Sequence, residues 1–213
     1  MRNNHHDLAS KYSEQDVRLD TDPDSKLWRS APAIFLETDS FGRHVRNHRT
    51  EVRSRWTQNN LYFLFGCPYL ELHLKPEPDR HKKTNGLWKW DVAETFIGST
   101  RDPLHRYREF EVSPQGEWLD LDINLQKPDK VNDPAWSSGF EVAARICREE
   151  KIWYGSMRIP YAAIEAGEPE AGNGLRINFF RSQGPEPVEL AWRPPLGESF
   201  HAPEQFGTLR FVR

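Results

Sequence analysis

The segment WKWDVAETFIGS, residues 88–99, holds the side chains best suited to binding a polar ligand. Trp88 and Trp90 precede a strand-like run in which Glu94 shares its parity with Val92 and Phe96, so its carboxylate lies on an apolar face. Such a carboxylate must be paired, or must face a concavity that a polar ligand fills. A pyranose, which stacks on an indole and needs hydrogen bonds at its rim, fits the second case. A strand-end ion pair with one of the 29 basic residues fits the first case equally well.

Two acidic pairs, Glu109 with Glu111 and Asp120 with Asp122, have a spacing that catalytic carboxylates could use. With a rise of about 3.3 Å per residue, the carboxylates of each pair lie roughly 6 to 7 Å apart on one strand face. Glycoside hydrolases place two carboxylates at comparable separations. A solvated strand face gives the same pattern, and 32 acidic residues produce such pairs by chance. We therefore interpret both pairs as wet strand faces.

Motifs for nucleophilic, nucleotide and zinc chemistry are absent from the sequence, which has no GxSxG, GxGxxG, HExxH or CxxC pattern. Cys67 and Cys147 have apolar, strand-like neighbours, which favours two buried free thiols. Haem would need axial ligands, for which Met157 and scattered histidines are available. His201 follows Phe200 in a long loop, and we expect its ring to bond to backbone, with a ligand role as the alternative.

Composition limits the classes of partner. The 213 residues carry 29 basic and 32 acidic side chains, a net charge of −3, which offers no general attraction to nucleic acid or anionic lipid. No stretch approaches the roughly 20 apolar residues of a membrane span, and the first residues lack the apolar core of a signal peptide. We therefore expect a cytoplasmic protein with no nucleic-acid or membrane partner. Eight tryptophans indicate an aromatic core or an aromatic ligand surface.

The elements that must position these residues are short strands. Residues 1–19 are polar and predict a loosely ordered leader, while residues 20–213 predict one all-β domain, a jelly-roll type antiparallel β-sandwich. Pro160 and Gly167 bound the one helical fragment, as its N1 residue and its C-cap. The predicted strands are 33–38, 51–57, 60–66, 93–99, 107–113, 117–125, 139–147, 151–159, 174–181 and 207–213.

Two features of this pattern bear on function. In EWLDLDINL the leucine parity predicts a buried face and the parity of Asp120 and Asp122 a wet one, and the PQG that precedes this strand predicts a hairpin over 107–125. A second hairpin is expected to turn at Glu149 and Glu150. The segments 70–91 and 182–206 are long, irregular loops, and a ligand role and a surface excursion are equally favoured for them.

In order along the chain, these segments resemble the carbohydrate-binding module family 9 and its relatives with the DOMON-like sandwich. The resemblance covers residues 20–213 and implies a jelly-roll sandwich without catalytic residues, with structural calcium in well-studied members and with relatives that are largely secreted or periplasmic. The segments that carry it are LDTDPDSKLWRSAP, TEVRSRWTQNNLYFLF, WKWDVAETFIG, YREFEVSPQGEWLDLDI, RIPYAAI, GLRINFFR and FHAPEQFGTLRFV.

The resemblance also implies roles for single residues. Trp88 takes the place of the first aromatic wall of a sugar slot, Phe200 that of the second, and Glu94 that of the acid that accepts hydrogen bonds from sugar hydroxyls. Glu111 stands where the family has a sugar-contacting arginine, and Phe180 stands where it has a polar contact residue. These two changes put specificity for a reducing end in doubt.

Other positions that match the family carry supporting roles. Asn178 and Arg181 are expected to support the slot or the adjoining loop, and His201 completes the candidate sugar-binding set. Trp28 and Trp56 are expected in the core, and Trp192 at a structural position. Calcium is possible, with oxygen ligands from Asp20, Asp22 and Asp24 or from Asp91.

The sequence therefore predicts a non-catalytic domain that grips a mono- or oligosaccharide between aromatic walls and serves polysaccharide or sugar metabolism. An interaction module of the same fold is the alternative, since Trp192 and Arg193 suit a protein partner as well. A glycoside hydrolase is the enzyme alternative, and it requires two carboxylates at the base of a groove, one with a raised pKa.

Overall fold

Short strands connected by loops make up nearly all of the regular structure. The computed structural model describes residues 7–213. Three short 3-10 helices, η1 (Leu87–Lys89), η2 (Tyr161–Ile164) and η3 (Pro203–Gln205), are the only helices in these residues, and none could cross a membrane. The strands are β1 (Asp7–Tyr12), β2 (Ala33–Leu36), β3 (Thr50–Trp56), β4 (Asn60–Pro68), β5 (Val92–Gly98), β6 (Arg106–Val112), β7 (Trp118–Asn124), β8 (Glu141–Cys147), β9 (Ile152–Pro160), β10 (Gly174–Gln183), β11 (Val188–Ala191) and β12 (Gly207–Val212).

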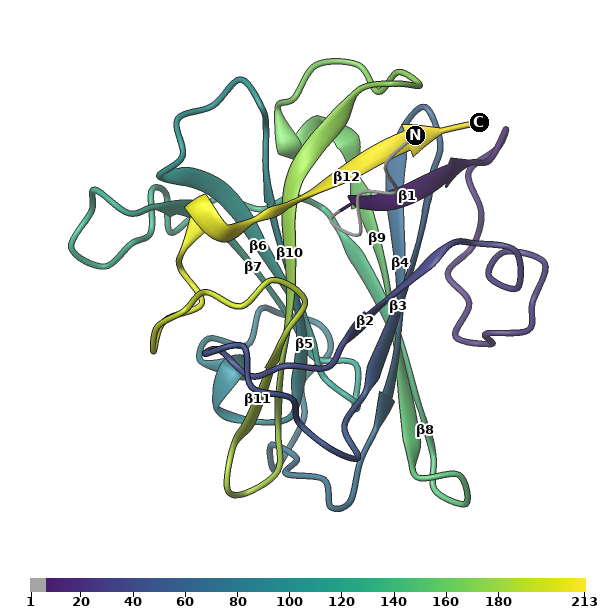
Figure 1. Cartoon of the computed structure of the whole chain (residues 1–213), viewed down its shortest axis with the longest axis vertical. Coiled ribbons are helices and arrows are strands. Elements are labelled where there is room, and N and C mark those ends of the chain that lie inside the picture. Colours follow the sequence, from purple (N-terminus) through teal and green to yellow (C-terminus); the bar gives the residue numbers. More distant parts are fainter. Residues whose placement is uncertain (1–6) are drawn as a thin grey trace.

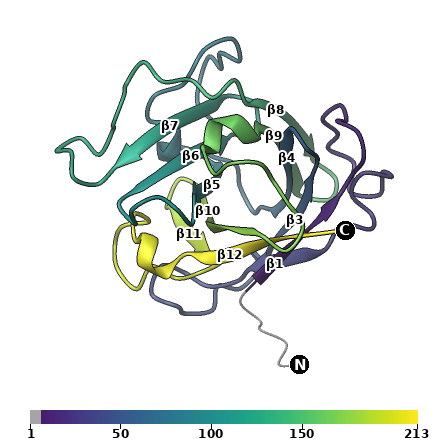
Figure 2. The ribbon, with the colours of Figure 1, turned by 90° about the horizontal axis from the view of Figure 1, so that it is seen from above.

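The strands form two facing layers that are joined along one side (Figure 1). Their order is β7-β6-β5-β10-β12-β1-β3-β4-β9-β8, with β11 added beside β10 and β2 beside β3. Seen from above, the sheet curves back on itself, so that the β5–β10 layer faces the β4–β9 layer (Figure 2). This confirms the predicted β-sandwich, and it adds that β12 and β1 make the two layers continuous.

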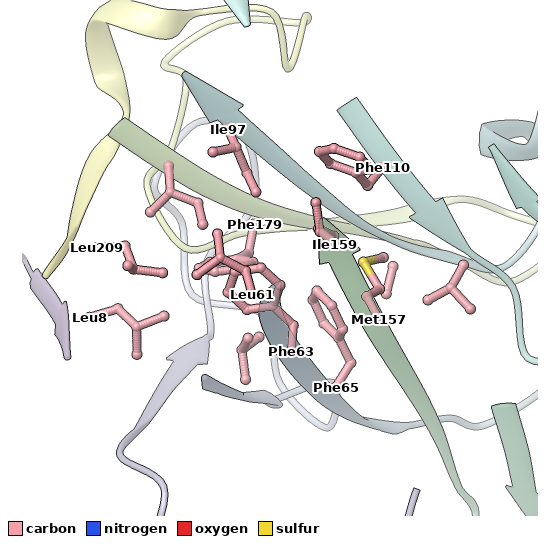
Figure 3. Close-up of a cluster of buried hydrophobic side chains, with 14 of the residues drawn as sticks. Leu8, Leu61, Phe63, Phe65, Ile97, Phe110, Met157, Ile159, Phe179 and Leu209 are labelled. Carbon is pink, nitrogen blue, oxygen red and sulfur yellow. The ribbon is translucent and has the colours of Figure 1, made fainter. Parts of the chain in front are cut away.

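The core between the layers follows from the alternation in the sequence. Phe63 of β4 packs edge-on against Phe179 of β10, with ring centroids 5.3 Å apart, and Met157 of β9 and Phe110 of β6 extend the cluster. Figure 3 shows these side chains pointing toward one another from both layers. Burial of each such side chain stabilises the fold by roughly 1.5 to 3 kcal/mol. The strands that build this core must therefore carry apolar side chains, and this pattern allowed ten of them to be predicted.

Trp28 and Trp56 are fully or almost fully buried, at 0% and 2% exposed, which confirms the core role expected for both. Trp192 packs against Phe179, with ring centroids 5.8 Å apart, as expected of a structural position. Both cysteines are free thiols, but only Cys67 is fully buried, so the expectation of two buried thiols is half right.

Two strands were not predicted. Residues 7–12 of the supposed loose leader form β1, which pairs in parallel with both β12 and β3. The rest of the sheet is antiparallel, so the predicted antiparallel sandwich needs this one correction. Only the first six residues of the expected leader 1–19 lie outside the described part of the chain. The second missed strand, β11, lies inside the predicted loop 182–206 and pairs with β10.

The wet face predicted for β7 is wrong. Asp120 is 0% exposed and Asp122 is 4% exposed. Lys83 lies with its Nζ 2.6 Å from the Asp120 carboxylate, and Arg108 forms an ion pair of the same length with Asp122. The hydroxyl and backbone N–H of Ser138 also donate to Asp120 at 2.7 Å. The loop residues Lys83 and Ser138 therefore pair Asp120, and Arg108 of the neighbouring strand β6 pairs Asp122.

The two predicted hairpins are confirmed, since β6 pairs with β7 and β8 with β9, both antiparallel. The helical fragment is a single 3-10 turn, η2, and its caps differ from the prediction. Pro160 is the N-cap rather than the first helical residue, and Glu165, in the left-handed region at φ 55°, ends the turn before Gly167 is reached.

Candidate functional site

Three glutamates meet on the outer face of the β5–β10 layer. The strand register places Glu94 of β5 directly opposite Glu111 of β6, and Glu109 of β6 opposite Phe96. Glu109 and Glu111 share one face of β6 because they are two residues apart. One carboxylate oxygen from each glutamate lies within 4.8 Å of the other two. The side chains are 2%, 4% and 0% exposed for Glu94, Glu109 and Glu111, so the predicted wet face of β6 is wrong.

These carboxyl groups have no basic partner among residues 7–213. One oxygen of Glu94, one of Glu109 and both of Glu111 have no hydrogen-bond partner, although all four are buried. The ion pair considered for Glu94 is therefore not formed in this part of the chain. Removing a charge from water without a partner is costly, so the site favours a bound proton or a bound ligand.

Burial raises the pKa of all three glutamates, and repulsion from neighbouring carboxylates adds to the rise for Glu94 and Glu111. Loss of hydration raises the pKa of Glu109 to about 7. It also raises the pKa of Glu111 well above its ordinary value, with Glu94 and Glu109 adding to the effect. The pKa of Glu94 is raised in the same way, first by burial and then by Glu109 and Glu189. All three groups thus hold protons more tightly than a carboxyl in water.

A pocket of about 550 Å³ opens over these glutamates. Glu94 and Glu109 lie on its wall, while Glu111 is too deep to line it. A volume of this size is typical of small-molecule sites. The other lining residues are Trp88, Phe96, Leu121, Ile123, Pro128, Asp129, Lys130, Val131, Ser182, Glu189, Glu198, Ser199, Phe200 and His201.

Trp88 is the exposed aromatic residue of this pocket. It belongs to η1, which Gly86 starts in the left-handed conformation at φ 77°, and Leu87 of the same turn is fully buried. Leu87 anchors the turn against Val92 and Leu119. The indole is 48% exposed, unlike the core tryptophans. An indole held at a pocket wall and left open to solvent is suited to stacking against a ligand.

Phe200 lies in the same pocket but is supported from behind. Its ring stacks on Phe180, with centroids 4.2 Å apart and planes inclined by 11°. Phe180 in turn packs edge-on against Phe96 at 4.9 Å. Phe180 is fully buried and does not line the pocket, so the position where the resemblance implied a polar contact serves as a platform for Phe200.

The ring of His201 also lines the pocket, and it does not bond to backbone as expected. Its Nδ1 forms a hydrogen bond with the hydroxyl of Tyr107, and the ring stacks on Phe96 with centroids 5.5 Å apart. Burial, with a smaller contribution from Lys130, lowers the pKa of His201 to about 4. The imidazole is therefore neutral near pH 7 and offers hydrogen bonds without a charge.

Asn178 and Arg181 are not brought to the pocket. Asn178 lies beside it, where its Nδ2 donates to the carbonyl of Arg193 at 2.8 Å and its Oδ1 accepts from the N–H of Arg193 at 3.0 Å. Arg181 lies on the inner face of β10, opposite Ala93 of the core, and is 0% exposed. Arg181 is thus corrected from a candidate sugar contact to an interior residue, while Asn178 supports the adjoining loop.

Replacing Asn178 with alanine should lower the free energy of unfolding by about 1 to 3 kcal/mol, because the partly buried backbone groups of Arg193 lose their partners. Urea denaturation measures this loss. Asn173→Ala, at an exposed position, is the matched control, and we expect it to change stability by less than about 0.5 kcal/mol. Equal effects of the two substitutions would contradict the anchoring role.

The aspartates proposed for calcium serve other partners in the structure. Asp20 accepts the backbone N–H of Asp22 at 2.9 Å, and Asp22 accepts that of Asp24 at 3.0 Å. Asp91 accepts the N–H of Gly184 at 2.6 Å. Within residues 7–213, the glutamate cluster is the one group of three potential ligands that meets closely enough for a metal ion. Calcium at the aspartates remains a prediction.

Sequence reasoning found part of this site. Glu94 could be identified because it interrupts an apolar parity, whereas Glu109 and Glu111 required the register between β5 and β6. The acidic rim formed by Glu189 and Glu198 was missed, because it comes from a segment with no recognisable period. On β6, Glu109 and Glu111 alternate with buried Phe110 and Val112. The sequence pattern alone therefore shows that the glutamates share a face, but it fits a buried glutamate face and a solvated one equally well.

Comparison with curated proteins finds distant sequence relatives. No protein-family profile matches the chain. An extracellular protein of Arthroderma benhamiae is 27% identical over 145 residues, which cover 62% of this chain and 65% of that protein. The endo-1,4-beta-xylanase A of Thermotoga neapolitana is 20% identical over 188 residues, covering 88% of this chain and 16% of the xylanase. The chain thus spans about two thirds of the first relative and about one sixth of the second.

Solved structures confirm the fold implied by the family resemblance. A Bacteroides uniformis protein with a suggested role in carbohydrate binding superposes with a TM-score of 0.75 and 17% identity, covering 97% of this chain and 99% of that one. A family 9 carbohydrate-binding module from Caldicellulosiruptor kristjanssonii, solved with cellotriose, gives a TM-score of 0.67 at 12% identity and covers 97% of this chain and 93% of the module. The same kind of module with glucose gives 0.66. The chain therefore has the fold of these carbohydrate-binding modules.

Proposed function

We propose that this chain is a non-catalytic carbohydrate-binding domain that holds a mono- or oligosaccharide in the pocket beside Trp88. The observation that carries the proposal is an exposed indole on the wall of a cavity whose other walls include buried carboxyl groups. A sugar ring presents C–H groups to an aromatic face and hydroxyls at its edge. In this pocket Trp88 and Phe200 would contact the ring, and Glu94 and Glu109 would bond to its hydroxyls.

The comparisons support the same class of ligand. Two modules with this fold were solved with cellotriose and with glucose, and the xylanase acts on a polysaccharide as its name states. A pocket with one open indole and one backed phenyl ring buries little area. We therefore expect a dissociation constant between micromolar and millimolar, which corresponds to about −8 to −4 kcal/mol.

Isothermal titration with glucose, xylose, cellobiose, cellotriose and xylobiose tests the proposal. Binding should also change the fluorescence of Trp88, because a stacked sugar removes water from the indole. If no sugar in this panel releases heat or changes the fluorescence at millimolar concentration, the proposal is wrong. A protein partner would then become the favoured ligand of the same surface.

The substitution Trp88→Ala should weaken sugar binding about five- to thirtyfold, since loss of one stacked indole costs roughly 1 to 2 kcal/mol. The melting temperature should stay nearly constant, because the indole is 48% exposed and outside the core. Phe41→Ala is the matched control, since Phe41 is 51% exposed and does not line the pocket. An unchanged affinity in Trp88→Ala would exclude the indole as a sugar platform.

A glycoside hydrolase is the second candidate, and one observation favours it. Glu109 has its pKa raised to about 7 and lies on the pocket wall with Glu94, as a general acid and its partner would. Release of reducing sugar from xylan or cello-oligosaccharides by the purified chain, lost in Glu109→Gln, would establish this activity. Sugar binding without release supports the non-catalytic domain.

A further inference from the structure

The cluster of Glu94, Glu109 and Glu111 has the geometry of a cation site. Calcium lies about 2.3 to 2.6 Å from its oxygen ligands, so oxygens around one ion are at most about 5 Å apart. The three glutamate oxygens fall within 4.8 Å of one another. We propose that these glutamates bind one calcium ion at the floor of the pocket.

The unpartnered oxygens are an independent reason for an ion at this place. Both oxygens of fully buried Glu111, one of Glu94 and one of Glu109 lack a donor within residues 7–213, although the strands that carry them pair with a neighbouring strand on each side. The two buried aspartates of β7 in the same layer are paired with cations, Asp120 with Lys83 and Asp122 with Arg108. Buried acceptors are almost always satisfied, and a cation satisfies several at once.

The chemistry of the donors selects a hard ion. Three carboxylates without a histidine or a thiolate suit calcium, magnesium or manganese rather than zinc or copper. Calcium accepts six to eight oxygens in irregular arrangements, whereas magnesium demands a near-ideal octahedron. The open pocket above Glu94 and Glu109 gives room for waters to complete the shell. If the proposed function holds, the hydroxyls of a bound sugar can replace some of these waters, because they are oxygen ligands of the same kind. Only this last point rests on the proposed function.

The surroundings also favour a cation. One basic side chain, Lys130, lines the pocket among the residues described, and His201 is held neutral by burial. Further acids line the same cavity from other loops and from β11. They are Asp129, Glu189 and Glu198.

Calcium titration of the chain after treatment with EDTA, in the absence of any sugar, tests the proposal. We expect one ion per chain, and a rise in melting temperature that grows with calcium concentration because the ion binds only the folded state. Magnesium should bind more weakly. The substitution Glu111→Gln should weaken calcium binding at least about 100-fold while the circular dichroism spectrum stays native, and Glu94→Gln should do the same.

Asp22→Asn is the matched control, because Asp22 belongs to the other acidic group considered for calcium. Its affinity for calcium should equal that of the unchanged chain. Calcium binding that survives Glu111→Gln but is lost in Asp22→Asn would overturn the proposal, as would no binding of any divalent ion at millimolar concentration. Saturable binding of glucosamine in EDTA that glucose does not share would assign the cluster to an ammonium ligand instead. Sugar titrations in calcium and in EDTA measure sugar binding with and without the ion, so failure of the calcium proposal can be distinguished from failure of the proposed function.

Discussion

Arg181→Met should lower the free energy of unfolding by about 3 to 5 kcal/mol, the cost of removing one partner from a buried charged network. The guanidinium is 0% exposed. It donates to Thr50 Oγ1 at 2.8 Å, to the carbonyl of Pro68 at 2.6 Å and to Gln183 at 2.8 Å. Methionine fills a similar volume, so the loss reports these hydrogen bonds rather than a cavity.

A second contribution comes from Asp91. Burial raises the pKa of this carboxyl group, and the nearby positive charge of Arg181 limits the rise. Without that charge, Asp91 would be left buried with no compensating cation. Loss of Arg181 therefore destabilises both β10, to which it belongs, and the start of β5, which Asp91 precedes.

Guanidinium chloride denaturation of the purified protein measures this effect. Arg43→Met is the matched control, because Arg43 is 75% exposed and its ion pair with Asp39 is worth less than about 1 kcal/mol. Sugar affinity measured well below the midpoint should be unchanged in Arg181→Met, since this side chain faces away from the pocket. A stable variant with weakened sugar binding would contradict the interior role.

Without calcium, the protein should be more stable in mildly acidic than in alkaline solution. The pKa of Glu109 is about 7 in the folded chain and near 4.5 in the unfolded one, so the folded chain binds more protons between these values. Its contribution is complete below pH 4.5 and is lost as the pH rises through 7. The difference of about 2.5 units corresponds to about 3 kcal/mol, since one unit is worth about 1.4 kcal/mol. Glu94 and Glu111 act in the same direction.

One histidine opposes this trend at lower pH. The pKa of His201 is lowered to about 4, so the unfolded chain binds more protons there between pH 6.5 and 4. The clearest window is therefore pH 6.5 to 8, where the glutamates act without this opposition. Calorimetry in EDTA at several pH values measures the melting temperature across the window.

Glu111→Gln is the control for the pH dependence. Glutamine has the shape of glutamate without its ionisable group, so the contribution of Glu111 itself to the pH dependence is lost, and the rise in stability from pH 8 to 6.5 should flatten. The variant should also be more stable than the unchanged chain at pH 8. A melting temperature that falls from pH 8 to 6.5 in the unchanged chain would show that folding does not favour protonation of the glutamate cluster.

Local sequence was sufficient for most of the fold. Ten strands were predicted because short apolar or alternating runs follow one another, separated by clusters of Pro, Gly, Asn and Asp that mark the turns. β1 was missed because Leu8 and Ala9 give it no visible period, and its burial comes from pairing with β12, 201 residues further along the chain. β11 is four residues long and lies in a Pro-rich segment. Both strands depend on contacts that no local pattern records.

The site was harder to predict for the same physical reason. Glu94 was identified within one strand, because a carboxyl group among buried apolar residues needs an explanation. The meeting of Glu94 with Glu109 and Glu111 depends on the register of two strands, which turn geometry and distant packing determine. Asp120 and Asp122 have the same spacing as the glutamates of β6, yet Lys83 from a loop and Arg108 from β6 neutralise them. Spacing alone does not separate a paired carboxylate from an unpaired one.

The parallel insertion of β1 between β12 and β3 covers the edge of β12 and the end of β3 that β2 leaves unpaired. A chain trimmed at residue 12 would expose the free N–H and C=O groups of both neighbours over their whole paired length. Such edges recruit strands from other molecules, and an identical segment of a second copy is the best match available. Domain swapping and fibrous self-association are therefore the failures to expect when this chain is expressed without β1.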